Sequence, residues 1–309
     1  MYTIENNTIY RSECKIEKVI NKIHGDVSVA ISGGADSDIL IDLFERLKYN
    51  LHANINYYFV DTGIEYHATK KHIEYLQERY NTDIKTIKPL NTVPYVVKHY
   101  GQPFINKRVS NLIERLQQHN FEFNNDLDFR LASEKYKNCR AALRWFYSDF
   151  GENSRYNITN NKLLFEFLQI SPPTFAISSK CCDICKKQTM HQIKGDLNVN
   201  GIRKCEGGIR QKINNCFNAD IAMFYPLLWY TNDDRKYYEY KYNIVHSDCY
   251  SVYGLPRTGC AGCPFAIGFE NELEIIRKFE PQLYNAVNNF FALSYEYTRE
   301  YRKFKGGVL

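Results

Sequence analysis

The sequence predicts an α/β fold in which a parallel sheet carries helices on both faces. Residues 27–31 are a short apolar, β-branched run that ends in the glycine-containing loop 32–37. Residues 38–47 then place apolar side chains at helical spacing. A second strand pattern follows at residues 55–60. Alternation of strands and helices along a chain is typical of a parallel sheet.

The loop at residues 32–37 has the composition of a phosphate-binding loop, Ser-Gly-Gly-Ala-Asp-Ser. Glycine lets the backbone turn sharply and approach an anion, and the amides at the start of the following helix point toward that anion. Two serines add hydroxyl donors. We therefore expect Ser32, Gly33, Gly34 and Ser37 to bind phosphate or sulfate. The alternative is a glycine-rich turn that binds no ligand.

A second polar string, Asp-Thr-Gly-Ile-Glu, follows the strand predicted at residues 55–60. Open α/β sheets bind ligands at the carboxyl ends of their strands. We therefore expect Asp61, Thr62 and Gly63 to belong to the same site as the loop. Taken alone, the string would be a turn that caps the helix predicted at residues 66–80.

The remaining chain divides by its pattern of apolar residues. A third strand is expected at residues 84–88, and amphipathic helices begin near residues 109–118. Residues 272–293 have helical spacing that Pro281 interrupts. The predicted parts are the N-terminal half of the α/β domain (1–108), a helical insertion (109–170), and the C-terminal half of the α/β domain with a cysteine region (171–309).

Composition excludes few functions. The chain has 309 residues, 44% hydrophobic residues and a formal net charge of +5. No apolar run is long enough to span a membrane, and the first residues lack the pattern of a secretory signal, so we expect a cytoplasmic protein without a membrane partner. The weak positive charge is compatible with nucleic acid as a partner, but no basic helix or aromatic platform in the sequence supports it.

Ten cysteines in an intracellular protein are typical of metal ligands or reactive thiols. One group contains Cys181, Cys182 and Cys185, and the other contains Cys260 and Cys263. Two separated pairs of thiolates suit either zinc or a 4Fe-4S cluster. Spacing alone does not select the metal.

The motifs resemble those of the PP-loop superfamily, and in particular the phosphoadenosine phosphosulfate (PAPS) reductase family. The loop 32–37 resembles the PP-loop, residues 61–65 resemble the second nucleotide motif, and residues 201–206 resemble a Gly-x-Arg-x-x-Glu loop. The resemblance implies an adenine nucleotide alpha hydrolase-like fold. It also implies that Arg203 and Arg210 face phosphate or sulfate, that Asp36 helps to place Mg²⁺, and that Asp36 and Arg203 are catalytic.

The cysteine pattern resembles the 4Fe-4S pattern of assimilatory adenylylsulfate reductases and of DNA phosphorothioation sulfur-transfer proteins. The resemblance implies that the ligands are Cys181, Cys182, Cys260 and Cys263. A competing set replaces Cys181 with Cys185, because Cys182 and Cys185 also form a Cys-x-x-Cys motif.

The resemblance implies an enzyme that binds an adenine nucleotide, ATP or a sulfonucleotide, and acts in sulfur transfer or substrate adenylation. Its implied partners are the nucleotide and a sulfur-donor protein. One alternative is a sulfonucleotide reductase, although residues 301–309 lack the C-terminal cysteine that serves as nucleophile in that family. The other alternative is a nucleotide-binding regulatory protein without catalysis.

Overall fold

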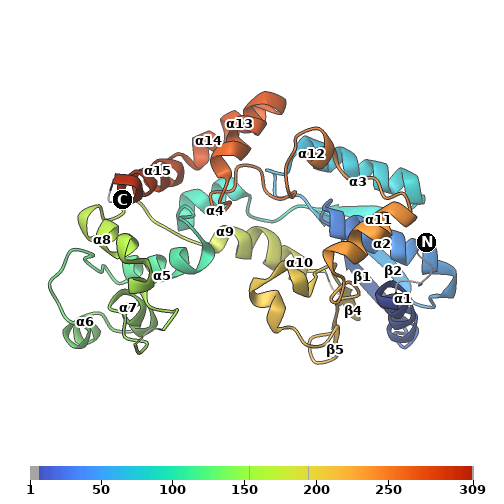
Figure 1. The fold of residues 1–309 in the computed structure, drawn as a ribbon, viewed down its shortest axis with the longest axis horizontal. Coiled ribbons are helices and arrows are strands. Elements are labelled where there is room, and N and C mark those ends of the chain that lie inside the picture. The colour runs from blue at the N-terminus through green and yellow to red at the C-terminus, as the bar shows by residue number, and fades with distance from the viewer. Residues whose placement is uncertain (1–6, 153, 194, 308–309) are drawn as a thin grey trace. The chain divides into compact units, whose positions relative to one another are not determined.

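The computed structural model describes residues 7–152, 154–193 and 195–307. The chain forms two compact units, each built from two segments (Figure 1). Unit 1 comprises Met1–Leu90 and Gln188–Ala261, and unit 2 comprises Asn91–Lys187 and Gly262–Leu309. These divisions differ from the predicted boundaries at residues 108 and 170, and the predicted insertion lies within unit 2.

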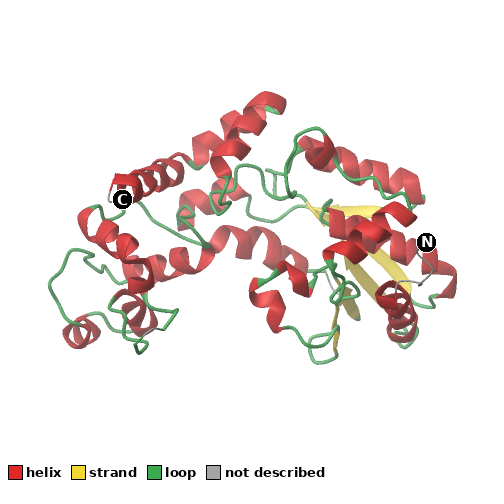
Figure 2. Ribbon diagram, in the orientation of Figure 1, coloured by secondary structure: helices red, strands yellow, loops and turns green. Residues whose placement is uncertain are grey.

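Unit 1 contains a six-stranded sheet with the strand order β3-β2-β1-β4-β6-β5 (Figure 2). All neighbouring pairs are parallel except β5 and β6, which are antiparallel. The strands are β1 (Asp26–Ala30), β2 (Asn54–Val60), β3 (Ile84–Ile87), β4 (Leu197–Val199), β5 (Phe217–Asn218) and β6 (Met223–Phe224). The predicted α/β class and the three predicted strands are confirmed.

Strand β1 lies at the centre of this sheet. Val27, Ser28 and Val29 are all buried, so both faces of the strand are covered, because successive side chains point to opposite faces. Val29 pairs with Tyr57 of β2 on one side and with Val199 of β4 on the other. The loop that follows β1 therefore emerges between the carboxyl ends of its two neighbours.

Helices of unit 1 pack with one another beside the sheet. Helix α2 contacts α1, α3 and α11, and α1 also contacts α11. Their apolar residues join the strands in one hydrophobic core that includes Ile16, Leu43 and Phe44. The helices and 3₁₀ turns of unit 1 are α1 (Asn7–Ile20), α2 (Ala35–Leu47), η1 (Lys48–Asn50), α3 (His67–Tyr80), α10 (Thr189–His191), η4 (Lys204–Glu206), η5 (Gly208–Lys212), α11 (Asn232–Lys241) and α12 (Asp248–Ser251).

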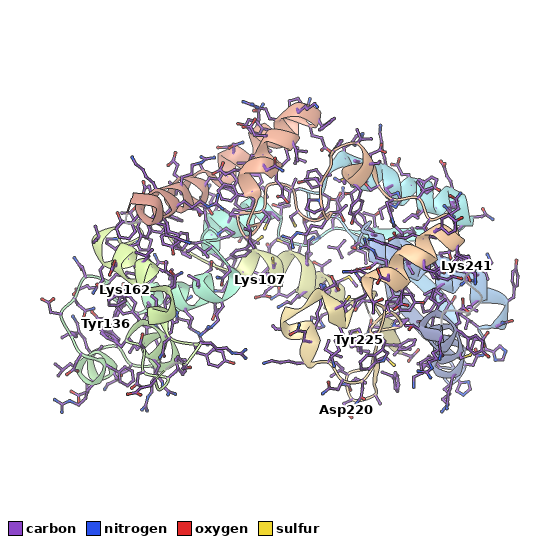
Figure 3. The ribbon with its side chains drawn as sticks, in the orientation of Figure 1. Lys107, Tyr136, Lys162, Asp220, Tyr225 and Lys241 are labelled. Atoms are coloured by element: carbon purple, nitrogen blue, oxygen red, sulfur yellow. The ribbon has the colours of Figure 1, made fainter. Side chains whose placement is uncertain are left out.

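Unit 2 is helical and has its own core, which is rich in aromatic residues. Phe104 packs against Tyr297, and Phe167 contacts the same ring. Figure 3 labels Lys107, Tyr136 and Lys162 among its side chains. Its elements are α4 (Val93–Tyr100), α5 (Lys107–Gln118), α6 (Phe129–Lys135), α7 (Arg140–Phe146), η2 (Ile158–Asn161), α8 (Lys162–Ile170), α9 (Lys180–Cys182), the π-helical η3 (Asp183–Gln188), α13 (Phe269–Phe279), α14 (Pro281–Phe290) and α15 (Ala292–Gly307).

The C-terminal helices show the predicted interruption. Pro281 is the first residue of α14, a position where its missing N–H costs no helical hydrogen bond. Among the described helices of both units, none combines the length and the apolar character that a membrane span requires.

Candidate functional site

The loop between β1 and α2 has a backbone that only glycine accommodates well. Gly33 has a φ of +69°, in the left-handed region. A Cβ atom at this position would lie 2.7 Å from Cγ2 of Thr69, which is closer than real Cβ contacts. Gly33 therefore lets the loop pass close to α3 and turn into the first residue of α2.

Ser37 fixes the shape of this loop from the first turn of α2. Its hydroxyl donates to the carbonyl oxygen of Gly34 at 2.7 Å and accepts from the N–H of the same residue at 3.0 Å. Ser32 Oγ lies 3.4 Å from Ser37 Oγ. The two serines predicted to bind phosphate are thus adjacent, and Ser37 also holds the loop in place.

Tyr250 of α12 meets the N-terminus of α2. The backbone N–H of Ala35 donates to Tyr250 Oη at 3.1 Å. Burial raises the pKa of Tyr250, while hydrogen bonds from Ala35 and Thr258 act in the opposite direction. The neutral hydroxyl of Tyr250 therefore accepts a hydrogen bond from one of the backbone N–H groups that an anion at this helix start would use.

A cavity of about 530 Å³ opens beside the loop, and four arginines line it. Arg203 and Arg210 were predicted for this site, whereas Arg235 and Arg257 were not. Its lining residues are Ala30, Ser32, Gly34, Ala35, Asp36, Ser37, Asn200, Gly201, Ile202, Arg203, Glu206, Arg210, Arg235, Tyr250, Pro256, Arg257 and Thr258. The sequence gives little indication that Arg235 and Arg257 belong to the site, because both lie outside the motifs and only the folded chain brings them to the cavity.

The two residues predicted to be catalytic form an ion pair. Arg203 Nε lies 2.7 Å from Asp36 Oδ1, and Arg203 is only 4% exposed. Burial raises the pKa of Asp36, and the nearby Arg203 guanidinium partly counteracts that effect. The ion pair links the start of α2, which follows β1, to the loop after β4, and these two strands are parallel neighbours in the sheet.

Polar groups hold three of the four arginines. Arg203 Nη1 donates to Asn232 Oδ1 at 3.0 Å, and the Arg203 backbone N–H donates to Glu206 Oε2 at 2.9 Å. Arg210 pairs with Glu206, and Arg235 pairs with Glu239 of α11. Arg257 is exposed and has no ion-pair partner in the described part of the chain. Its charge is therefore the one in this cavity that no carboxylate offsets.

The second predicted motif is not among the lining residues of this cavity. Asp61 Oδ1 accepts from the N–H of Gly63 at 2.9 Å, and Asp61 Oδ2 pairs with Lys70 at 2.8 Å. Thr62 donates to Glu65 at 2.9 Å. These side chains stabilise the turn that leads into α3, and nucleotide binding by residues 61–63 stays a prediction.

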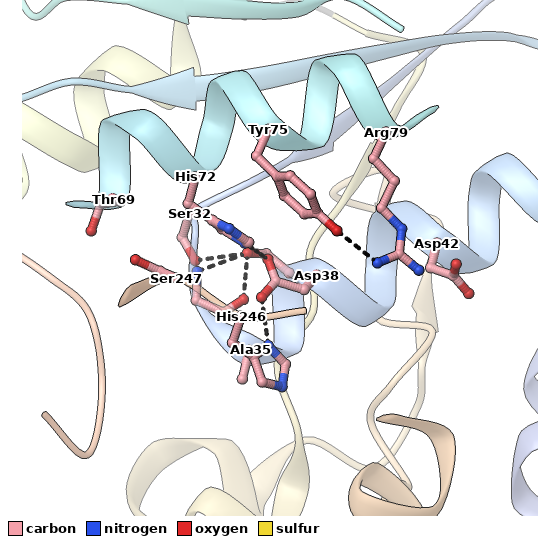
Figure 4. Close-up of polar contacts among 12 residues, drawn as sticks. Ser32, Ala35, Asp38, Asp42, Thr69, His72, Tyr75, Arg79, His246 and Ser247 are labelled. Atoms are coloured by element: carbon pink, nitrogen blue, oxygen red, sulfur yellow. Dashed lines mark hydrogen bonds and ion pairs between the residues drawn. The ribbon is translucent and has the colours of Figure 1, made fainter. Parts of the chain in front are cut away.

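A network of buried and half-buried polar groups lies behind the site (Figure 4). Asp38, in the first turn of α2, is fully buried and lies 2.9 Å from His72 Nε2 and 2.7 Å from His246 Nδ1. His246 Nε2 lies 3.1 Å from a carboxylate oxygen of Glu239. Burial alone would lower the pKa of His246, but its hydrogen bonds to the two carboxylates raise that pKa to about 9. His246 is therefore an imidazolium that ties α2 to α11.

The predicted metal ligands lie in both units, and no two cysteines form a disulfide. In unit 2, a hydrogen bond with Cys181 and burial raise the pKa of Cys182, and burial raises the pKa of Cys263 to about 11. In the same unit, Cys185 Sγ donates to the carbonyl oxygen of Asn91 at 3.3 Å.

Cys260 belongs to unit 1, where its sulfur lies 3.7 Å from Thr62 Oγ1. Across the described ranges, no three His, Cys, Asp or Glu side chains are grouped so that they could hold a metal. Four thiolates are a donor set that zinc or a 4Fe-4S cluster takes, and the four predicted ligands are divided between the two units. The cluster therefore stays a prediction.

Comparisons with known proteins agree with part of this description. Residues 26–124 match the phosphoadenosine phosphosulfate reductase domain family. The match confirms, for this part of the chain, the resemblance predicted from the loop at 32–37 and the string at 61–65. An uncharacterized protein of Methanocaldococcus jannaschii is 38% identical over 88 residues, which are 28% of this chain and 18% of that protein. The chain thus matches less than a fifth of the length of this curated relative.

Three solved structures show distant similarity. They are the U34-tRNA thiolase NcsA of Methanococcus maripaludis with its [4Fe-4S] cluster (14% identity, 96% of this chain and 79% of that one, TM-score 0.37), the PAPS reductase of Candida auris (9%, 84% and 97%, 0.40), and the NH₃-dependent NAD synthetase of Campylobacter jejuni (12%, 94% and 94%, 0.37). At these TM-scores none of them supports an inference about this chain.

Proposed function

We propose that the chain is a PP-loop enzyme that binds the phosphates of an adenine nucleotide in the arginine-lined cavity of unit 1 and uses ATP to adenylate an acceptor for sulfur transfer. One observation carries the proposal: the loop 32–37 and the four arginines share a single cavity. A guanidinium stays charged and matches the geometry of phosphate oxygens. The family match at residues 26–124 supports a nucleotide of this kind.

The charge of the cavity suits a polyanion. Four arginines line it, and Asp36 and Glu206 are the carboxylates among its lining residues. The cavity also includes the start of α2, where backbone N–H groups and the helix dipole favour negative charge. A triphosphate would therefore meet backbone and hydroxyl donors of the loop together with the guanidinium groups of the arginines.

The proposed reaction begins with a displacement at the α-phosphate. An acceptor oxygen attacks the α-phosphorus, a new P–O bond forms, and the bond to the bridging oxygen breaks so that pyrophosphate leaves with the electron pair. Arg203 and the loop amides would neutralise the charge that develops on the phosphoryl oxygens. A sulfur nucleophile such as hydrosulfide, supplied by a donor protein, then displaces AMP from the activated acceptor.

Asp36 has a further role in this proposal. Its Oδ1 atom pairs with Arg203, and the carboxylate side chain is 22% exposed, so a second oxygen can face the cavity. Asp36 would hold Mg²⁺, which would supply positive charge that offsets the charge of the phosphates. We assign no reaction step to an iron-sulfur cluster.

A second candidate function is sulfonucleotide reduction, which the family match favours. Equilibrium binding of ATP, ADP, AMP and adenylylsulfate to the full chain, with and without Mg²⁺, separates the two. We expect ATP to bind most tightly and to require Mg²⁺. Tighter binding of adenylylsulfate without Mg²⁺ would favour the reductase, and binding of none of the four would overturn both.

A further inference from the structure

A second cavity of unit 1, of about 410 Å³, shares no lining residue with the arginine-lined one. Arg11, Ser12 and Lys15 of α1 form one wall, and Pro226, Trp229 and Tyr230 belong to the segment after β6. The hydroxyl of Ser12 donates to the carbonyl oxygen of Pro226 at 2.9 Å, with both residues buried. This bond fixes α1 against the segment, so the cavity is part of the folded unit.

Trp229 presents an indole at this cavity from a well-anchored backbone. Its side chain is 51% exposed, whereas its neighbours Leu228 and Tyr230 are 0% and 1% exposed. The other tryptophan of the chain, Trp145, is 3% exposed in the core of unit 2. The Lys204 ammonium lies 5.1 Å from the centroid of the Trp229 ring. A rigidly held, half-exposed indole is a surface on which a flat ring can stack.

The two charged side chains that line this cavity, Arg11 and Lys15, are positive, and the Lys204 ammonium beside the indole adds a third positive charge. Arg11 and Lys15 are exposed and have no ion-pair partner among the described residues, and no carboxylate lines the cavity. The acidic residues of α1 are engaged elsewhere, since Glu13 pairs with Arg46 and Glu17 accepts from Asn50. A ligand at this surface would therefore gain from negative charge next to an aromatic ring.

We propose that this surface binds single-stranded nucleic acid, with one base stacked on Trp229 and the adjoining phosphates on Arg11, Lys15 and Lys204. Stacking of a base on an aromatic side chain and a groove of like positive charge are the two components by which proteins hold single strands. An acidic peptide would satisfy the cations but leave the indole without a partner. A double helix would keep its bases stacked on one another and inaccessible to the indole.

Two consecutive residues lie beside the two cavities: Arg203 lines the first, and Lys204 contacts Trp229 of the second. Lys204 follows Arg203 directly, and its backbone N–H donates to the carbonyl oxygen of Leu228 at 2.8 Å. A strand stacked on Trp229 would thus pass beside the loop that carries Arg203 toward the nucleotide phosphates. In the proposed function, this places a nucleic acid in the role of acceptor. That step rests on the proposed function, whereas binding of the strand does not.

The test is a titration of the full chain with a short oligouridylate. Binding is monitored by tryptophan fluorescence and by the fluorescence anisotropy of a labelled strand. We expect quenching, because Trp229 is the accessible one of the two tryptophans. With three phosphate contacts, the affinity should fall about twentyfold between about 50 mM and about 200 mM salt. Trp229→Ala should weaken binding about ten- to a hundredfold, and Arg11→Ala with Lys15→Ala should also reduce the salt dependence.

A matched control lies in the same unit. Tyr49 is 89% exposed and carries the Lys48 ammonium 5.6 Å from its ring centroid. Tyr49→Ala should leave strand binding unchanged. Equal affinity of wild type and Trp229→Ala, equal affinity for a polyglutamate peptide, or tighter binding of the duplex would overturn the proposal. Loss of ATP binding in Arg203→Ala with strand binding retained would separate this site from the nucleotide site.

Discussion

The arginine-lined cavity of unit 1 and the cysteines of unit 2 differ in how many of their polar contacts are already made without a ligand. At the cavity, Ser37 shapes the loop and Asp36, Glu206 and Glu239 hold three arginines in place. In unit 2, Cys181 and Cys182 interact with each other, and no group of three ligating side chains forms among the described residues.

The contrast follows from the chemistry of the two kinds of donor. Backbone amides and ion-paired guanidinium groups are stable where they are, so a phosphate site can exist without its ligand. Thiolates repel one another, and a metal site commonly gains its geometry from the ion that it binds. The proposed phosphate site therefore has its donors in place without a ligand, whereas a thiolate site would be completed by its metal.

The largest expected effect is the loss of bound metal when one predicted cysteine ligand is removed. After anaerobic purification we expect about four irons and four sulfides per chain in the wild type, and loss of nearly all of both in Cys182→Ala. ATP affinity should change less than about twofold, because Cys182 is not one of the residues that line the cavity. Metal and sulfide assays with a visible spectrum make the measurement. One zinc without sulfide in the wild type would contradict the iron-sulfur assignment.

Gly33→Ala should break the preformed loop. The new methyl group meets Thr69 at 2.7 Å in a backbone with φ +69°. We expect a loss of about 2 kcal/mol in the free energy of unfolding, and nucleotide binding at least about tenfold weaker.

Gly254→Ala is the matched control, since Gly254 has a φ of +71° and nothing lies within 4 Å of its added Cβ. Denaturant unfolding and ATP titration of both variants make the comparison. Equal effects of the two substitutions would show that the approach of the loop to α3 is unimportant.

The contact between His246 and the buried Asp38 makes the stability of unit 1 depend on pH. His246 has a folded-state pKa of about 9, above its ordinary value of 6.5. Its contribution to stability is therefore complete below about pH 6.5 and is lost as the pH rises through about 9. We expect the Tm to fall between about pH 7 and about pH 10, and to fall less in His246→Gln. The same fall in both proteins would assign the loss to other groups.

The smallest effect is expected at an exposed ion pair of unit 2. Arg144 Nε lies 3.3 Å from Asp149 Oδ2, with the two side chains 40% and 47% exposed. Arg144→Ala should cost less than about 1 kcal/mol of stability. A larger loss in urea unfolding would mean that Arg144 also matters through its contact with the Phe150 ring.

The features that could be predicted from the sequence are those that depend on residues close together in the chain. The strands at 27–31 and 55–60, the helix after residue 37 and the glycine-rich turn are local patterns, and the structure confirms them. Arg235, Tyr250 and Arg257 could not be predicted in this way, because only the packing of α11, α12 and the segment after α12 brings them to the cavity. The aromatic surface at Trp229 was missed for a related reason, since exposure of a single indole is decided by the fold and not by the spacing of apolar residues.

The central claim is that the arginine-lined cavity binds nucleotide phosphates. Isothermal titration of Mg-ATP into wild type, Arg203→Ala and Arg144→Ala tests it most directly. Because removal of Arg203 takes away a buried guanidinium and leaves Asp36 without its partner, we expect affinity to fall at least about thirtyfold. Arg144→Ala should bind as the wild type does. Equal affinity in all three proteins would contradict the account.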